Sequence, residues 1–355
     1  MKVIDEAIQN AVIDALDPER LELIILPTEK CNFRCTYCYE DFAIGRMSRS
    51  TVGAVRELVR KRLDSGLRHL SVSWFGGEPL LAWEIIQKLS SSFASDCKQA
   101  ECSFSSGMTT NGYLLTLDRV EELASYNSAN FQITLDGDEA EHDRTRRRAD
   151  GGKSFARIWA LLVAMHRSKT TFSVQLRIHV AREKVDSLRT LAHRISRELS
   201  PDHRFSIHFH QVSDLGKPLV GLTQLDSKEY KSLVEELSAV AGKKSESETQ
   251  LAASGYVCYA SKPNSLVIRA DGRIAKCTVA FSDDRNDVGR LLADGTLTFK
   301  SDRLQQWFSG LETLVPATLS CPWSQMSHSA SSVNEAQITP SSARPTISLS
   351  VLESA

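Results

Sequence analysis

The sequence lacks any stretch that approaches the roughly 20 consecutive apolar residues of a membrane-spanning helix. Its N-terminus, MKVIDEAIQNAVIDAL, interrupts its apolar pattern with acidic residues, unlike the continuous apolar run of a signal peptide. An excess of one charge is also missing, because 43 basic and 44 acidic residues leave a formal net charge of −1. This balance gives no support for the basic surface that nucleic-acid binding requires. We therefore expect a soluble cytoplasmic protein whose partners include neither a membrane nor a nucleic acid.

The composition lacks the bias of fibrous or wholly disordered chains, since 41% of the 355 residues are apolar and 25% are charged. In the first two thirds, short apolar runs alternate with stretches of helical period. The runs predict strands at 21–27, 69–75, 104–110, 131–135, 172–180 and 205–212. Helices are predicted at 51–63, 81–94, 117–126, 154–168, 185–199 and 227–241, the first with Ser50 as its N-cap. About six strand–helix units favour an α/β fold with parallel strands, as a barrel or as an open doubly wound sheet.

The pattern changes toward the C-terminus. The polar run Gly242–Thr249 predicts a linker, after which Ser265–Arg269 and Arg273–Val279 predict a β-hairpin with an Asp-Gly turn. A small second domain is expected to begin near Tyr256, and the serine-rich stretch from Ser324 predicts a disordered tail. The predicted units are an N-terminal helical segment (1–20), a core (21–242), a second domain (250–323) and the tail (324–355).

Cysteine is the informative residue type, with eight at positions 31, 35, 38, 97, 102, 258, 277 and 321. A secreted disulfide framework is typical of short, cysteine-dense chains with a signal peptide, and this sequence has neither property. Cys31, Cys35 and Cys38 follow the first predicted strand, where a loop can turn their sulfurs toward one iron–sulfur cluster. Three thiolates leave one iron of a [4Fe–4S] cluster open, and an open metal position makes a site reactive. Structural zinc, which would need a fourth ligand, and three coincidentally buried thiols are the alternatives.

Three further predicted strands end in polar or glycine-bearing segments. Gly76-Gly77-Glu78-Pro79 follows the second strand, where glycine permits a close backbone approach and the glutamate can accept from a ligand ammonium group. Thr109-Thr110-Asn111-Gly112 ends the third strand, and Gln132–Gly137 ends the fourth. All three lie at the carboxyl edge of the sheet, where such folds place their chemistry.

Basic side chains follow on the next segments. Arg146, in the segment His142–Arg146, stands in a run of arginines that could form a solvated basic face or supply a ligand contact. The neighbouring arginines at 144, 147 and 148 are expected at the surface. Arg177 and His179 alternate with apolar residues on the fifth strand and therefore share one face, which makes Arg177 a pocket candidate. His179, His208 and His210 are interpreted as pocket-lining or satisfied histidines rather than metal ligands.

The spacing C-x3-C-x2-C, with Tyr37 before the last cysteine, resembles the radical S-adenosylmethionine (SAM) superfamily, and the strand-end segments resemble that family's motifs. The resemblance implies a partial (β/α)6 TIM-like barrel in which Cys31, Cys35 and Cys38 hold a [4Fe–4S] cluster and SAM binds the open iron. It further implies cofactor contacts from Tyr37 (backbone, to adenine), Gly76, Gly77 and Glu78 (amino group), Thr134 (ribose or carboxylate) and Arg146 (carboxylate). Asn111 and Arg177 complete the predicted cofactor site, and Asp136 and Asp143 are candidates for a general base.

The segment from Tyr256 to Leu291 resembles the twitch or SPASM extension of peptide-modifying radical enzymes, a small α+β addition. Cys258 and Cys277 correspond to its opening pair of cluster ligands, and Cys321 falls where the next ligand is sought. The sequence departs from the full pattern because no cysteine follows Cys321. One auxiliary [4Fe–4S] cluster is therefore expected at most, and buried thiols in an incomplete extension are the alternative. The remaining pair, Cys97 and Cys102, is interpreted as incidental.

The resemblance implies an enzyme that reductively cleaves SAM to a 5′-deoxyadenosyl radical, which abstracts hydrogen from a peptide or protein side chain. We favour a carbon–carbon cyclophane or thioether crosslink in a ribosomally synthesised precursor peptide, with flavodoxin or ferredoxin as electron donor. The first alternative is an anaerobic sulfatase-maturating enzyme that makes formylglycine. The others are a non-catalytic iron–sulfur protein and a zinc-binding interaction domain.

Overall fold

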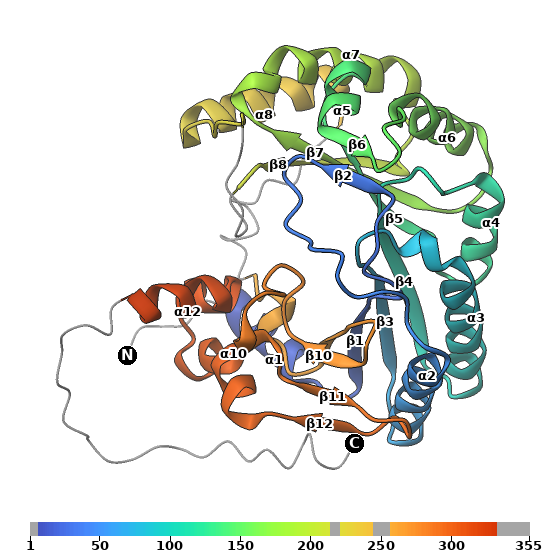
Figure 1. Cartoon of the computed structure of the whole chain (residues 1–355), viewed down its shortest axis with the longest axis vertical. Coiled ribbons are helices and arrows are strands. Elements are labelled where there is room, and N and C mark those ends of the chain that lie inside the picture. Colours follow the sequence, from blue (N-terminus) through green and yellow to red (C-terminus); the bar gives the residue numbers. More distant parts are fainter. Residues whose placement is uncertain (1–5, 214–220, 244–255, 332–355) are drawn as a thin grey trace.

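The computed structural model describes residues 6–213, 221–243 and 256–331, and its centre is a curved sheet with helices along the convex side (Figure 1). The six inner strands are parallel: β1 (Arg20–Ile25), β3 (His69–Trp74), β4 (Ser103–Thr110), β5 (Asn130–Leu135), β7 (Ser173–Val180) and β8 (Phe205–Gln211). The helices that follow them are α2 (Arg49–Asp64), α3 (Trp83–Gln99), α4 (Leu117–Ser125), α6 (Phe155–Arg167), α7 (Val185–Leu199) and α8 (Ser227–Ala241). This confirms the predicted partial (β/α)6 barrel.

The inner strands have two different faces. Residues that point toward the helices are apolar and fully buried, as Val72, Ile133 and Leu176 are. The opposite, concave face carries polar or small side chains at the alternating positions, among them Ser73 and Gln175. Parallel sheets are usually apolar on both faces because both are covered. The polar concave face is thus unusual for a buried core and suits a ligand site.

The C-terminal extension joins this sheet. A hairpin of β9 (Ser265–Ile268) and β10 (Arg273–Ala275) turns at Asp271-Gly272, as predicted, and Gly272 adopts a φ of +80°. β9 pairs in parallel with β1, and β11 (Gly289–Leu291) and β12 (Leu297–Phe299) continue the sheet, whose order is β12-β11-β10-β9-β1-β3-β4-β5-β7-β8. The extension is therefore continuous with the core sheet.

Short elements complete the described chain. They are α1 (Glu6–Leu16), β2 (Phe33–Cys35), η1 (Pro79–Ala82), α5 (Glu139–Thr145), β6 (Arg146–Arg148), η2 (Arg182–Lys184), η3 (Tyr259–Ser261), η4 (Asp284–Asn286), α10 (Ser301–Thr313), α11 (Pro316–Ser320) and α12 (Pro322–Ser331). Among the described residues, no helix is both long enough and apolar enough to cross a bilayer.

Two sequence predictions need correction. Ser48, not Ser50, caps α2, because its hydroxyl accepts from the Thr51 N–H at 3.1 Å. The disordered tail predicted from Ser324 is wrong for residues 324–331, which continue α12; the Trp323 indole donates to Asp283 at 3.2 Å and Met326 is buried. The rest of the tail and most of the predicted linker, residues 244–249, lie outside the described residues.

Candidate functional site

The cysteine loop, residues 31–38, is held in place by the segment that follows β5. Within the loop, β2 pairs antiparallel with β6, which sets Cys35 opposite Arg146. The Thr36 N–H extends the ladder by donating to the Thr145 carbonyl at 2.9 Å. A two-stranded sheet that sequence analysis did not predict thus fixes the loop geometry.

One cavity at the carboxyl ends of the inner strands collects most of the predicted site. The loop contributes the thiols of Cys31, Cys35 and Cys38 to its lining, together with Tyr37. The other predicted residues that line it are Gly76, Gly77, Asn111, Thr134, Arg146 and Arg177. These residues are far apart in the sequence and come from the ends of β3, β4, β5 and β7 and from β6. The predicted convergence of separate motifs is therefore present in the fold.

The thiols lie in a poorly solvated environment. Burial raises the pKa of Cys31 to about 12, although the Phe33 N–H donates to its sulfur at 3.3 Å. Burial also raises the pKa of Cys35 to about 11, against the opposing effect of the Arg146 guanidinium. A metal that binds such thiols displaces their protons. Among the described residues, no three His, Cys, Asp or Glu side chains are grouped closely enough to hold a single metal ion.

The Tyr37 side chain links the cysteine loop to Asp136, after β5, and to Arg146, on β6. Its hydroxyl donates to Asp136 Oδ1 at 3.1 Å and accepts from Arg146 Nη1 at 2.7 Å. Its ring meets the His179 ring edge-on, with centroids 4.8 Å apart. The aromatic residue of the cysteine motif therefore anchors the loop through its side chain.

Glu78 lies behind the cavity lining and is fully buried. Its carboxylate accepts from the Leu80 N–H at 3.0 Å, the Thr110 hydroxyl at 2.8 Å and the Asn111 N–H at 2.8 Å. Burial raises the pKa of Glu78, and these hydrogen bonds oppose the shift. Glu78 thus links the loop at Gly76 and Gly77, here called the Gly-Gly loop, to the end of β4, and its contact with a ligand stays a prediction.

The paired glycines are required by the chain itself. Gly76 has a φ of +117°, and a Cβ there would overlap the Thr28 carbonyl oxygen. A Cβ on Gly77 would lie 2.6 Å from the Lys30 carbonyl oxygen. Close packing against the segment just before Cys31 therefore explains both glycines, in addition to the ligand approach that the sequence suggested.

Neither of the two general-base candidates lines the cavity, and the contacts of each give it a structural role. Asp136 is fully buried, and its Oδ2 accepts from Lys184 Nζ at 3.1 Å and from the Thr145 hydroxyl at 2.8 Å. Burial alone would raise the pKa of Asp136, but Lys184, His179 and Arg146 outweigh it and hold the pKa well below the usual range. A carboxylate this acidic and enclosed is a poor proton acceptor.

Asp143 serves as a helix cap. Its Oδ1 accepts from the backbone N–H groups of Ser154 and Phe155, at 2.9 and 3.0 Å, at the start of α6. Ser154, the residue at the N-cap position, makes no such bond with its own side chain. Asp143 therefore caps α6 in place of the Ser154 side chain, although it lies eleven residues earlier in the chain.

Several cavity residues were missed from the sequence. Those that the sequence did not single out are Phe33, Tyr39, Glu40, Phe75, Val212 and Ser213, whereas Thr109, Thr110 and His179 belong to segments that it did. Burial lowers the pKa of His179 to about 3, and its Nδ1 lies 3.2 Å from Asp136 Oδ1, which fits the predicted pocket-lining histidine. Lys184 carried no sequence signal, since its place under the site depends on the packing of β7 against β5.

The second set of cysteines also comes together. Cys258 begins η3, Cys277 follows β10, and Cys321 lies between α11 and α12. Burial raises the pKa of Cys258 to about 11, and the nearby thiols of Cys277 and Cys321 add to the shift. In contrast, Cys97 and Cys102 are buried at the end of α3, outside both groups, and the Cys102 N–H donates to the Cys97 carbonyl at 2.8 Å.

The comparisons with known sequences single out the first half of the chain. The model of the Radical SAM superfamily matches residues 25–195. A GTP 3',8-cyclase of Campylobacter jejuni subsp. doylei is 32% identical over 130 residues, which are 35% of this chain and 38% of that protein. The radical SAM cyclopropyl synthase TigE of Paramaledivibacter caminithermalis is 24% identical over 122 residues, 30% of this chain and 25% of that protein. The chain thus aligns with well under half the length of the curated relatives.

Solved structures match over a larger part of the chain. The structure of anSMEcpe with bound AdoMet matches with a TM-score of 0.62 at 18% identity. The match covers 81% of this chain and 84% of the anSMEcpe chain. Streptococcus suis SuiB bound to precursor peptide SuiA has a TM-score of 0.58 at 16% identity, over 86% of this chain and 70% of its own. At these identities the likeness shows a shared fold, which includes the region after residue 195.

Proposed function

We propose, from the premise that residues 25–195 are a radical SAM domain, that this chain binds a [4Fe–4S] cluster and SAM and modifies a peptide or protein side chain. The observation that carries the proposal is the single cavity that three thiols share with the ends of four strands. The modification that we favour is a carbon–carbon or thioether crosslink in a ribosomally synthesised precursor peptide.

The residues around the cavity fit a cluster. Three partly buried thiols from one loop face the same space, and soft thiolate donors are the ligands that iron–sulfur clusters take. Arg146 stands opposite Cys35, so a cation is already in place beside an anionic cluster. We assign Cys31, Cys35 and Cys38 as the cluster ligands.

The charges of SAM match the rest of the lining. SAM carries a carboxylate, an ammonium group and ribose hydroxyls. Arg146 and Arg177 suit the carboxylate, and Thr134 and Asn111 can bond the hydroxyls or the ammonium group. The backbone of Gly76 and Gly77 lies open to the same space. In this proposal Glu78 acts as a positioning residue, because it holds the Asn111 backbone and the Gly-Gly loop together.

When bound, the cluster and SAM supply a 5′-deoxyadenosyl radical, which takes a hydrogen atom from the substrate. The chain contributes position and shielding. Tyr37 packs against Ala181, Val212 and Leu222 and closes one side of the cavity with apolar contacts. Phe33 and Phe75 line other parts of it. Apolar walls of this kind limit side reactions of a radical with solvent.

The second cysteine group fits one auxiliary cluster in the same proposal. Cys258, Cys277 and Cys321 come from three segments that the extension packs together, and the nearby Cys321 thiol adds to the burial that raises the pKa values of Cys258 and Cys277. Flavodoxin or ferredoxin is the proposed electron donor for the first cluster.

The test is anaerobic reconstitution of the chain with iron and sulfide, followed by incubation with reductant, SAM and a peptide encoded beside it. The expected result is 5′-deoxyadenosine together with a peptide that has lost two hydrogen atoms and does not react with a hydrazine. A product that does react with a hydrazine is an aldehyde and indicates formylglycine instead. A parallel incubation with GTP tests the reaction named for the cyclase relatives. The absence of 5′-deoxyadenosine from every incubation would overturn the proposal.

A further inference from the structure

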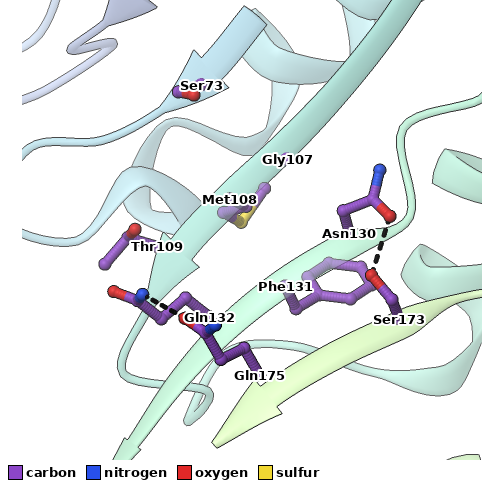
Figure 2. A pocket seen from close by; sticks show the side chains of 9 residues that line it. All are labelled: Ser73, Gly107, Met108, Thr109, Asn130, Phe131, Gln132, Ser173 and Gln175. Atoms are coloured by element: carbon purple, nitrogen blue, oxygen red, sulfur yellow. Dashed lines mark hydrogen bonds between the residues drawn. The ribbon is translucent and has the colours of Figure 1, made fainter. Parts of the chain in front are cut away.

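A second cavity lies on the concave face of the sheet, next to the candidate site. The residues that matter in it are Ser73, Thr109, Asn130, Gln132, Ser173 and Gln175, on β3, β4, β5 and β7. Figure 2 shows the side chains of Thr109, Gln132 and Gln175 grouped across three neighbouring strands. Thr109 lines both this cavity and the cysteine cavity, so the two cavities adjoin at this residue.

The strand register fixes the distance between the two cavities. Gln132 lies two residues before Thr134 on β5, and Gln175 lies two residues before Arg177 on β7. Residues two apart on a strand share a face and are separated by roughly 7 Å. Thr109, Gln132 and Gln175 form one row across three strands. This row therefore lies two residues, roughly 7 Å, closer to the N-terminal ends of the strands than the row proposed to bind SAM.

The two glutamines bond to each other and still have one donor and one acceptor for a ligand. Gln132 Nε2 donates to Gln175 Oε1 at 2.8 Å, and beside them the Ser173 hydroxyl donates to Asn130 Oδ1 at 2.8 Å (Figure 2). Within the described chain, the hydrogen bonds of this pair leave Gln132 Oε1 as an acceptor and Gln175 Nε2 as a donor. The lining residues include no ionisable side chain, and two of them, Ser73 and Gly107, are small and leave space beside the glutamines.

We propose that the Gln132–Gln175 pair is a substrate subsite that binds an amide group of an uncharged peptide segment adjoining the modified side chain. An amide has one acceptor and at least one donor, and so it can satisfy both free groups of the pair. A carboxylate has no donor and an ammonium group has no acceptor, so each would leave one partner without a hydrogen bond. The inference rests on the proposed function, because it takes the occupant to be the peptide substrate.

The test measures peptide binding to the full chain reconstituted with cluster and SAM. The probe is the capped pentapeptide acetyl-Gly-Ser-Asn-Ser-Gly-amide, compared with counterparts that carry Asp or Ala at the third position. Dissociation constants are measured by isothermal titration for the wild-type chain and for Gln132→Leu and Gln175→Leu. The matched control is Gln99→Leu, at an exposed glutamine on α3. Iron content and SAM binding are recorded for each protein.

We expect saturable binding of the Asn peptide that weakens about tenfold or more in both subsite variants and stays unchanged in the control. The Asp peptide should bind at least tenfold more weakly than the Asn peptide. An Ala peptide that binds as well as the Asn peptide assigns the amide to the main chain, and a weaker one assigns it to the side chain. Equal affinity in the subsite variants, equal affinity for the Asp peptide, or no binding to the wild-type chain would overturn the subsite. Failure of the proposed function is seen separately, as a lack of cluster or SAM binding in the wild-type chain.

Discussion

The two groups of cysteines reach similar burial by different routes. Cys31, Cys35 and Cys38 lie within one short loop, and the pairing of β2 with β6 fixes that loop. Cys258, Cys277 and Cys321 come from three segments that meet only because η3, the hairpin and the α11–α12 junction pack together. The first group can be recognised from its spacing alone, whereas the second was predicted only through the resemblance to a known extension, because its spacing along the chain carries no signal of its own.

The two regions are nevertheless connected. β9 adds to the edge of β1, and the Arg269 guanidinium binds the Glu29 carboxylate through Nη2–Oε2 at 2.5 Å and Nε–Oε1 at 3.2 Å. Both side chains are buried, and Glu29 lies two residues before Cys31. The extension therefore supports the start of the cysteine loop through a buried ion pair.

The largest contrast is expected between Cys35→Ala and Cys277→Ala. Cys35→Ala should abolish the absorbance of the first cluster and all 5′-deoxyadenosine production, because it removes one of the three proposed ligands. Cys277→Ala should keep SAM cleavage and lower the iron content only. Iron analysis and chromatography of the products separate the two results.

Cys97→Ala is the control for loss of a thiol as such, since this buried cysteine lies in neither group. It should retain both clusters. Full SAM cleavage by Cys35→Ala would refute the ligand assignment, and equal loss of cleavage in the Cys277 variant would show that the two groups act as one.

The next largest effect concerns the buried charge under the cysteine loop. Asp136→Asn leaves Lys184 without its closest anion, and breaking a buried pair in this way costs about 3–5 kcal/mol in the free energy of unfolding. The variant also weakens the Tyr37 anchor, so iron content should fall although no ligand is changed. Denaturant unfolding of the full chain measures the first effect and iron analysis measures the second.

The pH dependence gives this prediction a sign. Because the folded pKa of Asp136 lies below its unfolded value of about 3.9, its contribution is complete above that value and is lost as the pH falls toward the folded pKa. His142 is buried with a pKa of about 3, so its share of the acid loss falls between about pH 6.5 and 3. Asp136→Asn should remove the share of Asp136 in the loss below about pH 4, while other carboxylates with a lowered pKa, such as Asp202, keep theirs, and the part at higher pH from His142 and His179 should remain. An unchanged profile below pH 4 would contradict the ion pair.

Much of the fold could be predicted because the six strand–helix units alternate in period. The strand-end residues were also predictable, since parallel strands bring their carboxyl ends to one edge. The roles of individual acids were not: Glu78, Asp136 and Asp143 are all near the site in sequence terms, and each is used to hold the chain together. Sequence shows where a carboxylate lies along a strand, but its partners belong to other strands and helices.

The smaller elements were missed for a related reason. β2 and β6 have three residues each, too few for a period to emerge, and their pairing is set by contacts between distant segments. The hairpin was predicted correctly, but its pairing with β1 was not. The sequence of a strand does not indicate which other strand it will pair with.

The link between the two regions can be broken at Arg269. Arg269→Ala leaves the Glu29 carboxylate buried without its cation, which should destabilise the full chain by about 3 kcal/mol. The loss should be largest next to the cysteine loop and should reduce occupancy of the first cluster. The double variant Arg269→Met with Glu29→Gln removes both charges and should recover most of the stability. A double variant as unstable as the single one would show that packing, rather than the ion pair, joins the regions.

The smallest effect separates the glycine that supports the cysteine loop from one that does not. Gly76→Ala places a Cβ against the Thr28 carbonyl at a positive φ, which should cost about 2 kcal/mol and weaken SAM binding because the loop has to shift. Gly53 lies inside α2 with open space around it, so Gly53→Ala should instead stabilise the chain by about 1 kcal/mol. Denaturant unfolding and SAM titration of both variants make the comparison. If Gly76→Ala bound SAM normally, the close packing between the Gly-Gly loop and the segment before Cys31 would not control the cofactor site. Adding one methyl group should thus lower the stability at Gly76 and raise it at Gly53, because only Gly76 is packed against the segment just before Cys31.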